Sequence, residues 1–118
     1  MTILGWNYHG LGHPATVNEL VRLVHTNKPK LLFVSETRQK KEYVESLRWR
    51  LGLKTVLSFS EKGKGGGLAL FWDESITVEL FKLSKRHIDV TVVNLPQGNK
   101  LRCTFVYGEP VTHERHNF

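Results

Sequence analysis

Cysteine is nearly absent from this sequence, which holds Cys103 and no other cysteine among its 118 residues. A single cysteine excludes an internal disulfide framework and a cysteine-based zinc site. The sequence also lacks the run of roughly 18 apolar residues that a membrane-spanning helix needs, and its first residues lack the basic leader of a signal peptide. Because a lone thiol suits a reducing compartment, we expect an intracellular location, and the nucleus is one option.

The composition is that of a folded protein with an excess of positive charge. Hydrophobic residues make up 40% and charged residues 24% of the chain, so a core can form and wholesale disorder is excluded. The length fits one domain, residues 1–118. The net charge of +6 favours polyanionic partners, chiefly nucleic acid, although a generic basic surface would give the same number.

The first third of the sequence has the pattern of a β-α-β-α unit. Residues 3–6 and 31–34 are short apolar runs of the kind that form strands. A helix fits the residues between them, and a second amphipathic helix fits residues 39–51, with Gly52 as its stop. A strand–helix–strand connection of this length implies parallel strands. The run at 31–34 is wholly apolar, as expected of a strand covered on both faces.

The first of these helices is expected to open at His13 and Pro14, since proline is tolerated in the first turn. Thr16 and Glu19 have the spacing of a capping box. The four apolar residues that follow at helical spacing, and so share one face, are Val17, Leu20, Val21 and Val24.

After Gly52 the sequence changes to short strand-like runs with turn-rich breaks between them. This succession predicts an α/β (α+β) fold in which the β-α-β-α unit runs into an antiparallel meander. Residues 109–118 have the pattern of a turn and the start of a helix, and the ending looks like a cut. The strand-like runs are residues 55–59, 68–72, 76–83, 87–94 and 100–107.

Two polar residues stand where the first two strands end. Glu36 follows a wholly apolar strand directly, and ligands gather at the carboxyl ends of strands in α/β sheets. A carboxylate there can hold Mg²⁺, which takes oxygen ligands; the alternative is that Glu36 caps the following helix. Asn7 could lie beside it and orient a carboxylate or a phosphate oxygen, or it could be ordinary turn chemistry before glycine-rich sequence.

Other candidates are weaker. Tyr107 ends the last strand-like run and could present its hydroxyl to a phosphate, or it could be a rim residue. The glycines at 63–67 do not match a Walker A loop, because Gly-Lys-Ser/Thr is missing and a strand follows. They fit a flexible hairpin whose Lys62 and Lys64 can contact a phosphate backbone, and Arg38 is a further candidate for nucleic-acid contact.

The remaining chemistry-bearing residues have structural explanations. His113 and His116 have a zinc-like spacing without a second ligand pair, which favours a solvated helix start. His87 and Asp89 project from one face of a strand and could form a pair, although a polar outer face is the default. Cys103 lies inside a strand and is expected in the core.

Taken in order, five segments resemble the motifs of the endonuclease/exonuclease/phosphatase superfamily. Their sequences are most similar to the apurinic-endonuclease-like domain of plant non-LTR (LINE-type) retrotransposons, and the resemblance runs from Met1 to Phe118. The segments are Trp6–Gly12, Leu31–Thr37, Gly66–Trp72, His87–Val90 and Thr104–Pro110.

This resemblance implies part of a four-layered α/β sandwich, dependence on Mg²⁺ and hydrolysis of phosphodiesters in DNA. It implies that Glu36 is a metal ligand, that Asn7 organises the metal site, and that Tyr107 contacts the scissile phosphate. Tyr8 departs from the small residue that relatives often carry, which leaves the Asn and the glycines of the motif intact.

The sequence departs from the family after Tyr107, where no Asp-x-Asn or Ser-Asp-His motif follows. We therefore expect the N-terminal part of the domain without its C-terminal half, and a chain that is inactive as it stands. Two alternatives remain open: a phosphatase of the same superfamily, or a non-catalytic module that binds nucleic acid. In the latter, phosphates would be tracked by Lys28, Lys30, Arg38, Lys40, Lys41, Arg48, Arg50, Lys62 and Lys64.

Overall fold

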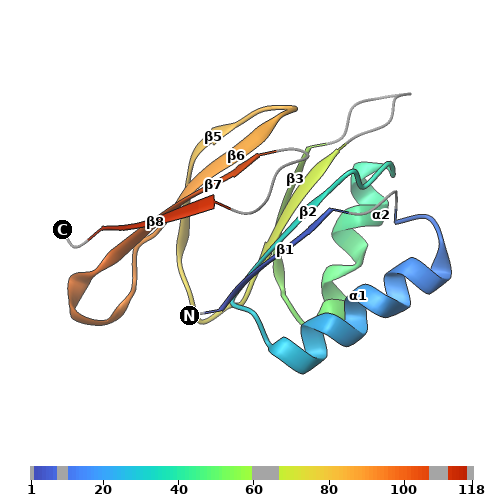
Figure 1. The fold of residues 1–118 in the computed structure, drawn as a ribbon, viewed down its shortest axis with the longest axis horizontal. Coiled ribbons are helices and arrows are strands. Elements are labelled where there is room, and N and C mark those ends of the chain that lie inside the picture. Colours follow the sequence, from blue (N-terminus) through green and yellow to red (C-terminus); the bar gives the residue numbers. More distant parts are fainter. Residues whose placement is uncertain (1, 8–10, 60–66, 107–111, 117–118) are drawn as a thin grey trace.

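The protein is built in three layers: helices, a first sheet and a second sheet (Figure 1). The helices cover one face of the first sheet, and the second sheet lies on its other face. This is the α/β (α+β) partial sandwich that the sequence predicts. The computed structural model describes residues 2–7, 11–59, 67–106 and 112–116, with Asn7 and 112–116 described by their backbone alone.

The first sheet has four strands in the order β1-β2-β4-β3. β1 and β2 are parallel, as expected of strands joined by a helix, and the other neighbours are antiparallel. The hairpin of β3 and β4 thus belongs to this sheet and not to the later meander. The strands are β1 (Ile3–Asn7), β2 (Leu31–Ser35), β3 (Thr55–Phe59) and β4 (Leu68–Trp72).

Helix α1 (Pro14–Asn27) joins β1 to β2 and begins earlier than a capping box at Thr16 and Glu19 would require. The N-cap is His13, whose Nδ1 accepts a hydrogen bond from the backbone N–H of Ala15 at 3.3 Å. The predicted capping box is therefore wrong. Because Pro14 fits the first helical position, it starts the helix upstream of Thr16.

The predicted helix over residues 39–51 is two short helices, α2 (Lys41–Ser46) and α3 (Arg48–Leu51). They separate at Leu47, whose N–H bonds to the carbonyl of Val44, three residues back, in a tighter turn. The predicted inward residues Val44, Leu47 and Leu51 are all buried, and Gly52 ends α3 at φ 73°.

Two apolar cores lie on either side of the first sheet. One fills the space between the helices and the face of β2 and β4 that carries Leu32 and Phe71. The other joins the opposite face to the second sheet, where the rings of Phe33 and Phe105 stack with centroids 5.0 Å apart. Every residue of β2 is buried, which confirms the prediction of a strand covered on both faces.

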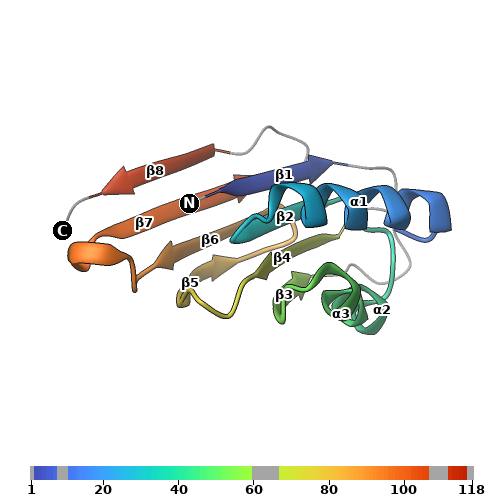
Figure 2. The same cartoon turned by 90° about the horizontal axis from the view of Figure 1, so that it is seen from below.

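The second sheet is the predicted antiparallel meander, in the order β5-β6-β7-β8 (Figure 2). The expected helix start at the end of the chain is wrong, because β8 pairs with β7 and so occupies an otherwise open sheet edge. His113 and His116 therefore belong to a strand. The strands are β5 (Val78–Leu83), β6 (His87–Val92), β7 (Lys100–Val106) and β8 (Thr112–His116), with a 3-10 turn η1 (Pro96–Gly98) before β7.

Among the described residues, no helix has the length and apolar character needed to cross a membrane.

Candidate functional site

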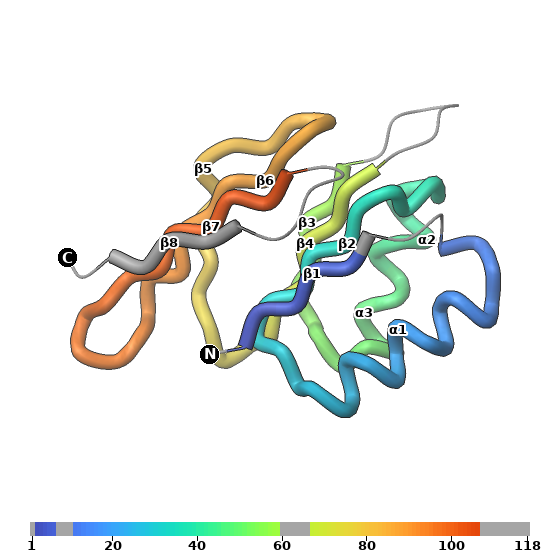
Figure 3. Tube along the Cα trace, in the orientation of Figure 1, coloured from blue at the N-terminus to red at the C-terminus, as the bar shows by residue number. Residues whose placement is uncertain are grey.

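The carboxyl ends of the two parallel strands meet at one edge of the first sheet (Figure 3). Asn7 is the last residue of β1 and is the register partner of Ser35, the last residue of β2. Glu36 follows at once, so the backbones of Asn7 and Glu36 are neighbours across two strands. Leu68, the first residue of β4, is the other register partner of Ser35 and completes the edge.

The segment that follows β2 has a strained backbone. Glu36 has φ 58° and Arg38 has φ 53°, in the left-handed region that residues other than glycine rarely enter. Such conformations cost of order 1–3 kcal/mol each and are concentrated at functional sites. Two of them within three residues mark 36–38 as the segment of this edge most worth testing for function.

Residue 37 ties this strained segment to two neighbouring segments. The N–H of Thr37 donates to the carbonyl of Gly67 at 3.3 Å, and its carbonyl accepts from the N–H of Leu11 at 2.9 Å. The carbonyl of Leu11 in turn accepts from the hydroxyl of Tyr43 on α2 at 2.9 Å. Thr37 is 1% exposed, and its Oγ1 has no hydrogen-bond partner among the described residues. The segment is therefore fixed by Gly67, just before β4, and by Leu11, which α2 holds in turn.

Glu36 presents a largely buried carboxylate at this edge. Its side chain is 17% exposed, and Nη2 of Arg38 lies 3.8 Å from its Oε2. It does not cap the following helix, because the N-cap of α2 is Lys40. The alternative role that the sequence left open for Glu36 is thus removed.

The donors at this edge fit a hard cation better than a soft one. Glu36 supplies carboxylate oxygens, and Asn7 stands at the neighbouring register position. Mg²⁺ takes oxygen ligands and often uses one or two protein carboxylates, with water in the remaining positions. Within the part of the chain that the structure describes, no three His, Cys, Asp or Glu side chains gather into one cluster. The described residues therefore offer one acidic ligand here and no preformed cage.

Of the predicted nucleic-acid and phosphate contacts, only Arg38 lies within the described residues. The structure places Arg38 beside Glu36. Lys62, Lys64 and Tyr107 lie outside the described residues.

Two solved structures share this architecture. The 3′ phosphatase NExo from Neisseria, bound to a product DNA hairpin, matches 91% of this chain with 41% of its own, at 18% identity and a TM-score of 0.62. The AP endonuclease LMAP from Leishmania major matches 89% of this chain with 39% of its own, at 14% identity and a TM-score of 0.58. The chain shares its fold with part of these enzymes. It spans about two fifths of their length. No protein-family model and no curated protein matches the sequence.

A second polar cluster lies on the outer face of the second sheet, around Asp89. This residue is 7% exposed and accepts hydrogen bonds from Arg102 at 3.2 and 2.7 Å and from Thr104 at 3.3 Å. The hydrogen bond from Arg102 is the main reason that the pKa of Asp89 lies below its ordinary value, against the effect of burial. His87, the suggested partner, makes the smallest contribution to this lowering of the pKa of Asp89 and does so through its charge; its Nδ1 hydrogen-bonds to Oγ of Ser84 at 2.9 Å.

The true partner of Asp89 was not found from the sequence, although a signal for it exists. Arg102 and Thr104 alternate along β7 on the face that Asp89 uses on β6, and Asp89 and Thr104 are register partners. The partnership of Asp89 with Arg102 and Thr104 can be inferred only when the register between β6 and β7 is known.

Replacing Asp89 by asparagine is expected to lower the free energy of unfolding at pH 7 by about 1–2 kcal/mol, a value reduced because Arg102 is half exposed. The pKa of Asp89 is depressed on folding, so its contribution is complete above the ordinary value of 3.8 and is lost as the pH falls through the lower folded value. Urea unfolding at pH 7 and pH 3 should therefore show that the difference in unfolding free energy between the native chain and Asp89→Asn is smaller at pH 3. An equal difference at the two pH values would contradict this account. Glu79→Gln, at an exposed position, is the control.

Cys103 belongs to the core, as predicted, and is fully buried. Burial raises the pKa of its thiol to about 12, so the reactive thiolate is not populated at neutral pH. The residue is structural, because it packs in the core that joins the two sheets.

Proposed function

We propose that this chain is part of a metal-dependent phosphohydrolase domain of the endonuclease/exonuclease/phosphatase superfamily that acts on DNA, and that Glu36 is its metal ligand. One observation carries the proposal: a largely buried carboxylate lies at the carboxyl ends of two parallel strands, in a fold shared with a DNA-bound 3′ phosphatase and an AP endonuclease. The ordered motifs of the sequence, most similar to those of plant LINE-type elements, support the same assignment.

In this proposal Mg²⁺ would be held by Glu36 with help from Asn7, and it would polarise a phosphoryl oxygen and lower the pKa of a bound water. Glu36 supplies charge, and the strained backbone of residues 36–38 fixes where that charge lies. Arg38, Lys62 and Lys64 would bind the DNA backbone, and Tyr107 would contact the phosphate. Within the described residues, Glu36 belongs to no group of three or more His, Cys, Asp or Glu side chains.

A lone carboxylate and an amide make a weak metal site, and each missing acid–base group typically costs about 10²–10⁴ in rate. We therefore propose that the 118 residues by themselves bind DNA and turn it over no faster than background. A second candidate activity, removal of a terminal phosphate, is favoured by the likeness to the 3′ phosphatase. The two activities differ in substrate and not in the metal site.

Two assays on the purified chain test this proposal. Binding to a fluorescent duplex should weaken steeply between 50 and 200 mM salt, because phosphate contacts release counterions. Supercoiled plasmid and a 3′-phosphorylated oligonucleotide should each be cleaved no faster than background. The result should be the same with Mg²⁺, with EDTA and with the Glu36→Ala variant.

The outcomes separate the parts of the proposal. Binding that does not weaken with salt would remove DNA as the partner. Mg²⁺-dependent cleavage that Glu36→Ala abolishes would support the metal site but contradict the claim of inactivity, and the substrate cleaved would decide between phosphodiesterase and phosphatase.

A further inference from the structure

The hairpin formed by β5 and β6 carries an exposed patch that the candidate site does not use. Between Leu80 and Ile88 the sequence holds three residues with permanent positive charge and no acid. These are Lys82, Lys85 and Arg86; all are exposed, and none forms an ion pair with another described residue. Cations gathered in this way attract a polyanion through counterion release.

The turn of this hairpin holds its charges in place. Oγ of Ser84 accepts hydrogen bonds from the backbone N–H groups of Arg86 and His87, each at 3.1 Å. The N–H of Ser84 also donates to the carbonyl of His87 at 2.9 Å. A turn closed by three such bonds is ordered before any partner arrives, which lowers the entropic cost of binding.

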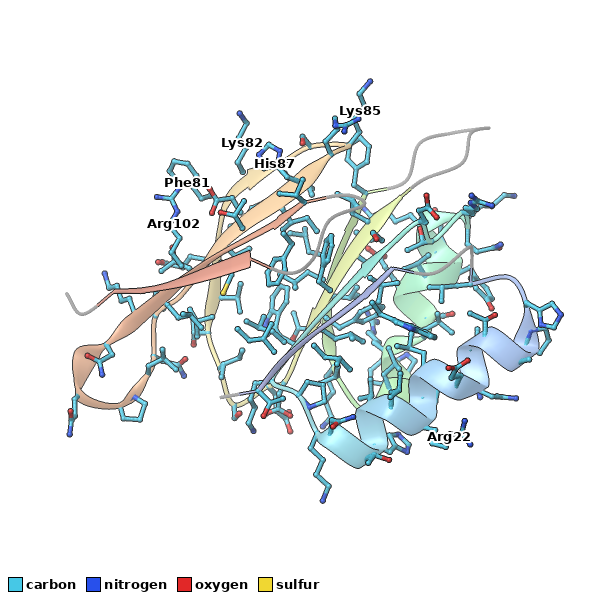
Figure 4. All side chains as sticks on the ribbon, in the orientation of Figure 1. Arg22, Phe81, Lys82, Lys85, His87 and Arg102 are labelled. Carbon is cyan, nitrogen blue, oxygen red and sulfur yellow. The ribbon has the colours of Figure 1, made fainter. Side chains whose placement is uncertain are left out.

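An aromatic ring stands beside these cations. The register between β5 and β6 shifts between Leu80 and Lys82, so Phe81 is the extra residue of a β-bulge. Phe81 is 70% exposed, and the guanidinium of Arg102 lies 4.7 Å from its ring centroid. Arg102 is itself held by Asp89. The bulge therefore presents a supported ring to solvent, next to Lys82 (Figure 4).

The turn between β5 and β6 lies toward the same side of the molecule as the carboxyl end of β2, which Glu36 follows (Figure 1). Phe33, three residues before Glu36, stacks on Phe105, and Phe105 is the register partner of Ile88 at the start of β6. The hairpin turn directly precedes Ile88. A nucleic-acid strand that reaches the carboxyl edge of β2 can therefore continue onto the hairpin.

We propose that the β5–β6 hairpin is a second nucleic-acid contact, one that binds an unpaired strand flanking the candidate site. Lys82, Lys85 and Arg86 bind its phosphates, and one base stacks on the open face of Phe81. Single-stranded nucleic acid is bound elsewhere by this combination of cations with an aromatic ring. The inference rests on the proposed function, since it extends a surface for the same polyanion.

The test compares two double variants that remove the same charge. Lys82→Ala/Lys85→Ala alters the hairpin. Arg22→Ala/Lys54→Ala alters exposed cations on α1 and just before β3, with Arg22 on the far side of the molecule (Figure 4). Affinity for a fluorescent single-stranded oligonucleotide is measured by anisotropy from 50 to 200 mM salt. The hairpin variant should lose about 1.4 from the logarithmic salt slope, because each phosphate contact on a single strand contributes about 0.7. The control should keep the slope.

Phe81 is tested separately. Phe81→Ala should weaken binding of the single strand about 5- to 100-fold and that of a blunt duplex far less, because a paired base cannot stack on the ring. Phe81→Trp should retain the affinity.

Three results would overturn the inference. If the native chain shows no salt-dependent binding, DNA fails as the partner, and the proposed function fails with it. If the native chain binds but the hairpin variant behaves like the control, the hairpin contact fails and the proposed function stands. If sedimentation shows a dimer that Phe81→Ala dissociates while nucleic-acid binding is unchanged, the exposed ring serves self-association instead.

Discussion

Gly67→Ala is expected to lower the free energy of unfolding by about 3 kcal/mol. Gly67 has φ +100°, where a side chain strains the backbone by roughly 1–3 kcal/mol. A Cβ at this position would also clash with Oγ1 of Thr37 and would lie 3.4 Å from the carbonyl oxygen of Phe59. Overpacking of this kind adds about 1–3 kcal/mol. Chemical denaturation followed by circular dichroism measures the change.

A second glycine provides the matched control. Gly52 also has positive φ, +73°, but a Cβ there meets nothing within 4 Å, so Gly52→Ala should cost only about 1 kcal/mol. Adding Thr37→Ala to Gly67→Ala should recover the steric part of the loss and leave the backbone part. Equal losses in the two single variants would show that Thr37 does not pack against Gly67 as the structure has it.

The Gly67 substitution also bears on the candidate site. The carbonyl of Gly67 accepts the hydrogen bond from the N–H of Thr37, the residue after Glu36. A displaced Gly67 therefore moves the segment that positions the Glu36 carboxylate. We expect weaker binding of a divalent cation in Gly67→Ala, even where the variant remains folded.

Phe105→Ala is expected to cost about 3–5 kcal/mol, the largest effect predicted for this chain. Phe105 is fully buried and stacks on Phe33, so its ring joins the second sheet to the first. Its removal would leave a cavity between the sheets as well as lose the transfer free energy. Urea titrations with near- and far-ultraviolet circular dichroism measure the loss and show whether both sheets unfold together.

Phe81→Ala is the control for Phe105→Ala, since it removes the same ring from an exposed bulge. It loses only the contact with Arg102 and should change stability by about 1 kcal/mol or less. If Phe105→Ala were as mild as Phe81→Ala, the sheets would not share one core. Two separate unfolding transitions in the native chain would contradict cooperative packing in the same way.

The local pattern of the sequence predicted the elements better than their partners. The apolar run at 31–34 predicted a strand buried on both faces, because no polar side chain interrupts the run. The same reasoning put residues 55–59 and 68–72 at the observed strands, yet it could not say that they join β2, because strand pairing is non-local. The tail failed for the same reason: residues 112–116 have no apolar alternation, and pairing with β7 makes them a strand.

The candidate site was foreseeable in outline and not in detail. The rule that ligands gather at carboxyl ends of strands selected Asn7 and Glu36, and the register of β1 and β2 makes their backbones neighbours. The left-handed backbone conformation at Glu36 and Arg38 could not be predicted, because glutamate and arginine normally avoid that conformation. The link from Thr37 to Gly67 joins positions 30 residues apart and becomes visible only in the fold.

Paramagnetic Mn²⁺, added in place of Mg²⁺ and followed by amide signals in NMR, tests the central claim that Glu36 binds the metal. Substoichiometric Mn²⁺ should broaden the signals of Asn7 and of residues 35–37 before others. Glu36→Gln should abolish this broadening, whereas Glu74→Gln, at an exposed carboxylate paired with Lys54, should leave it intact. Broadening that persists in Glu36→Gln, or that centres on other acidic residues, would contradict the account.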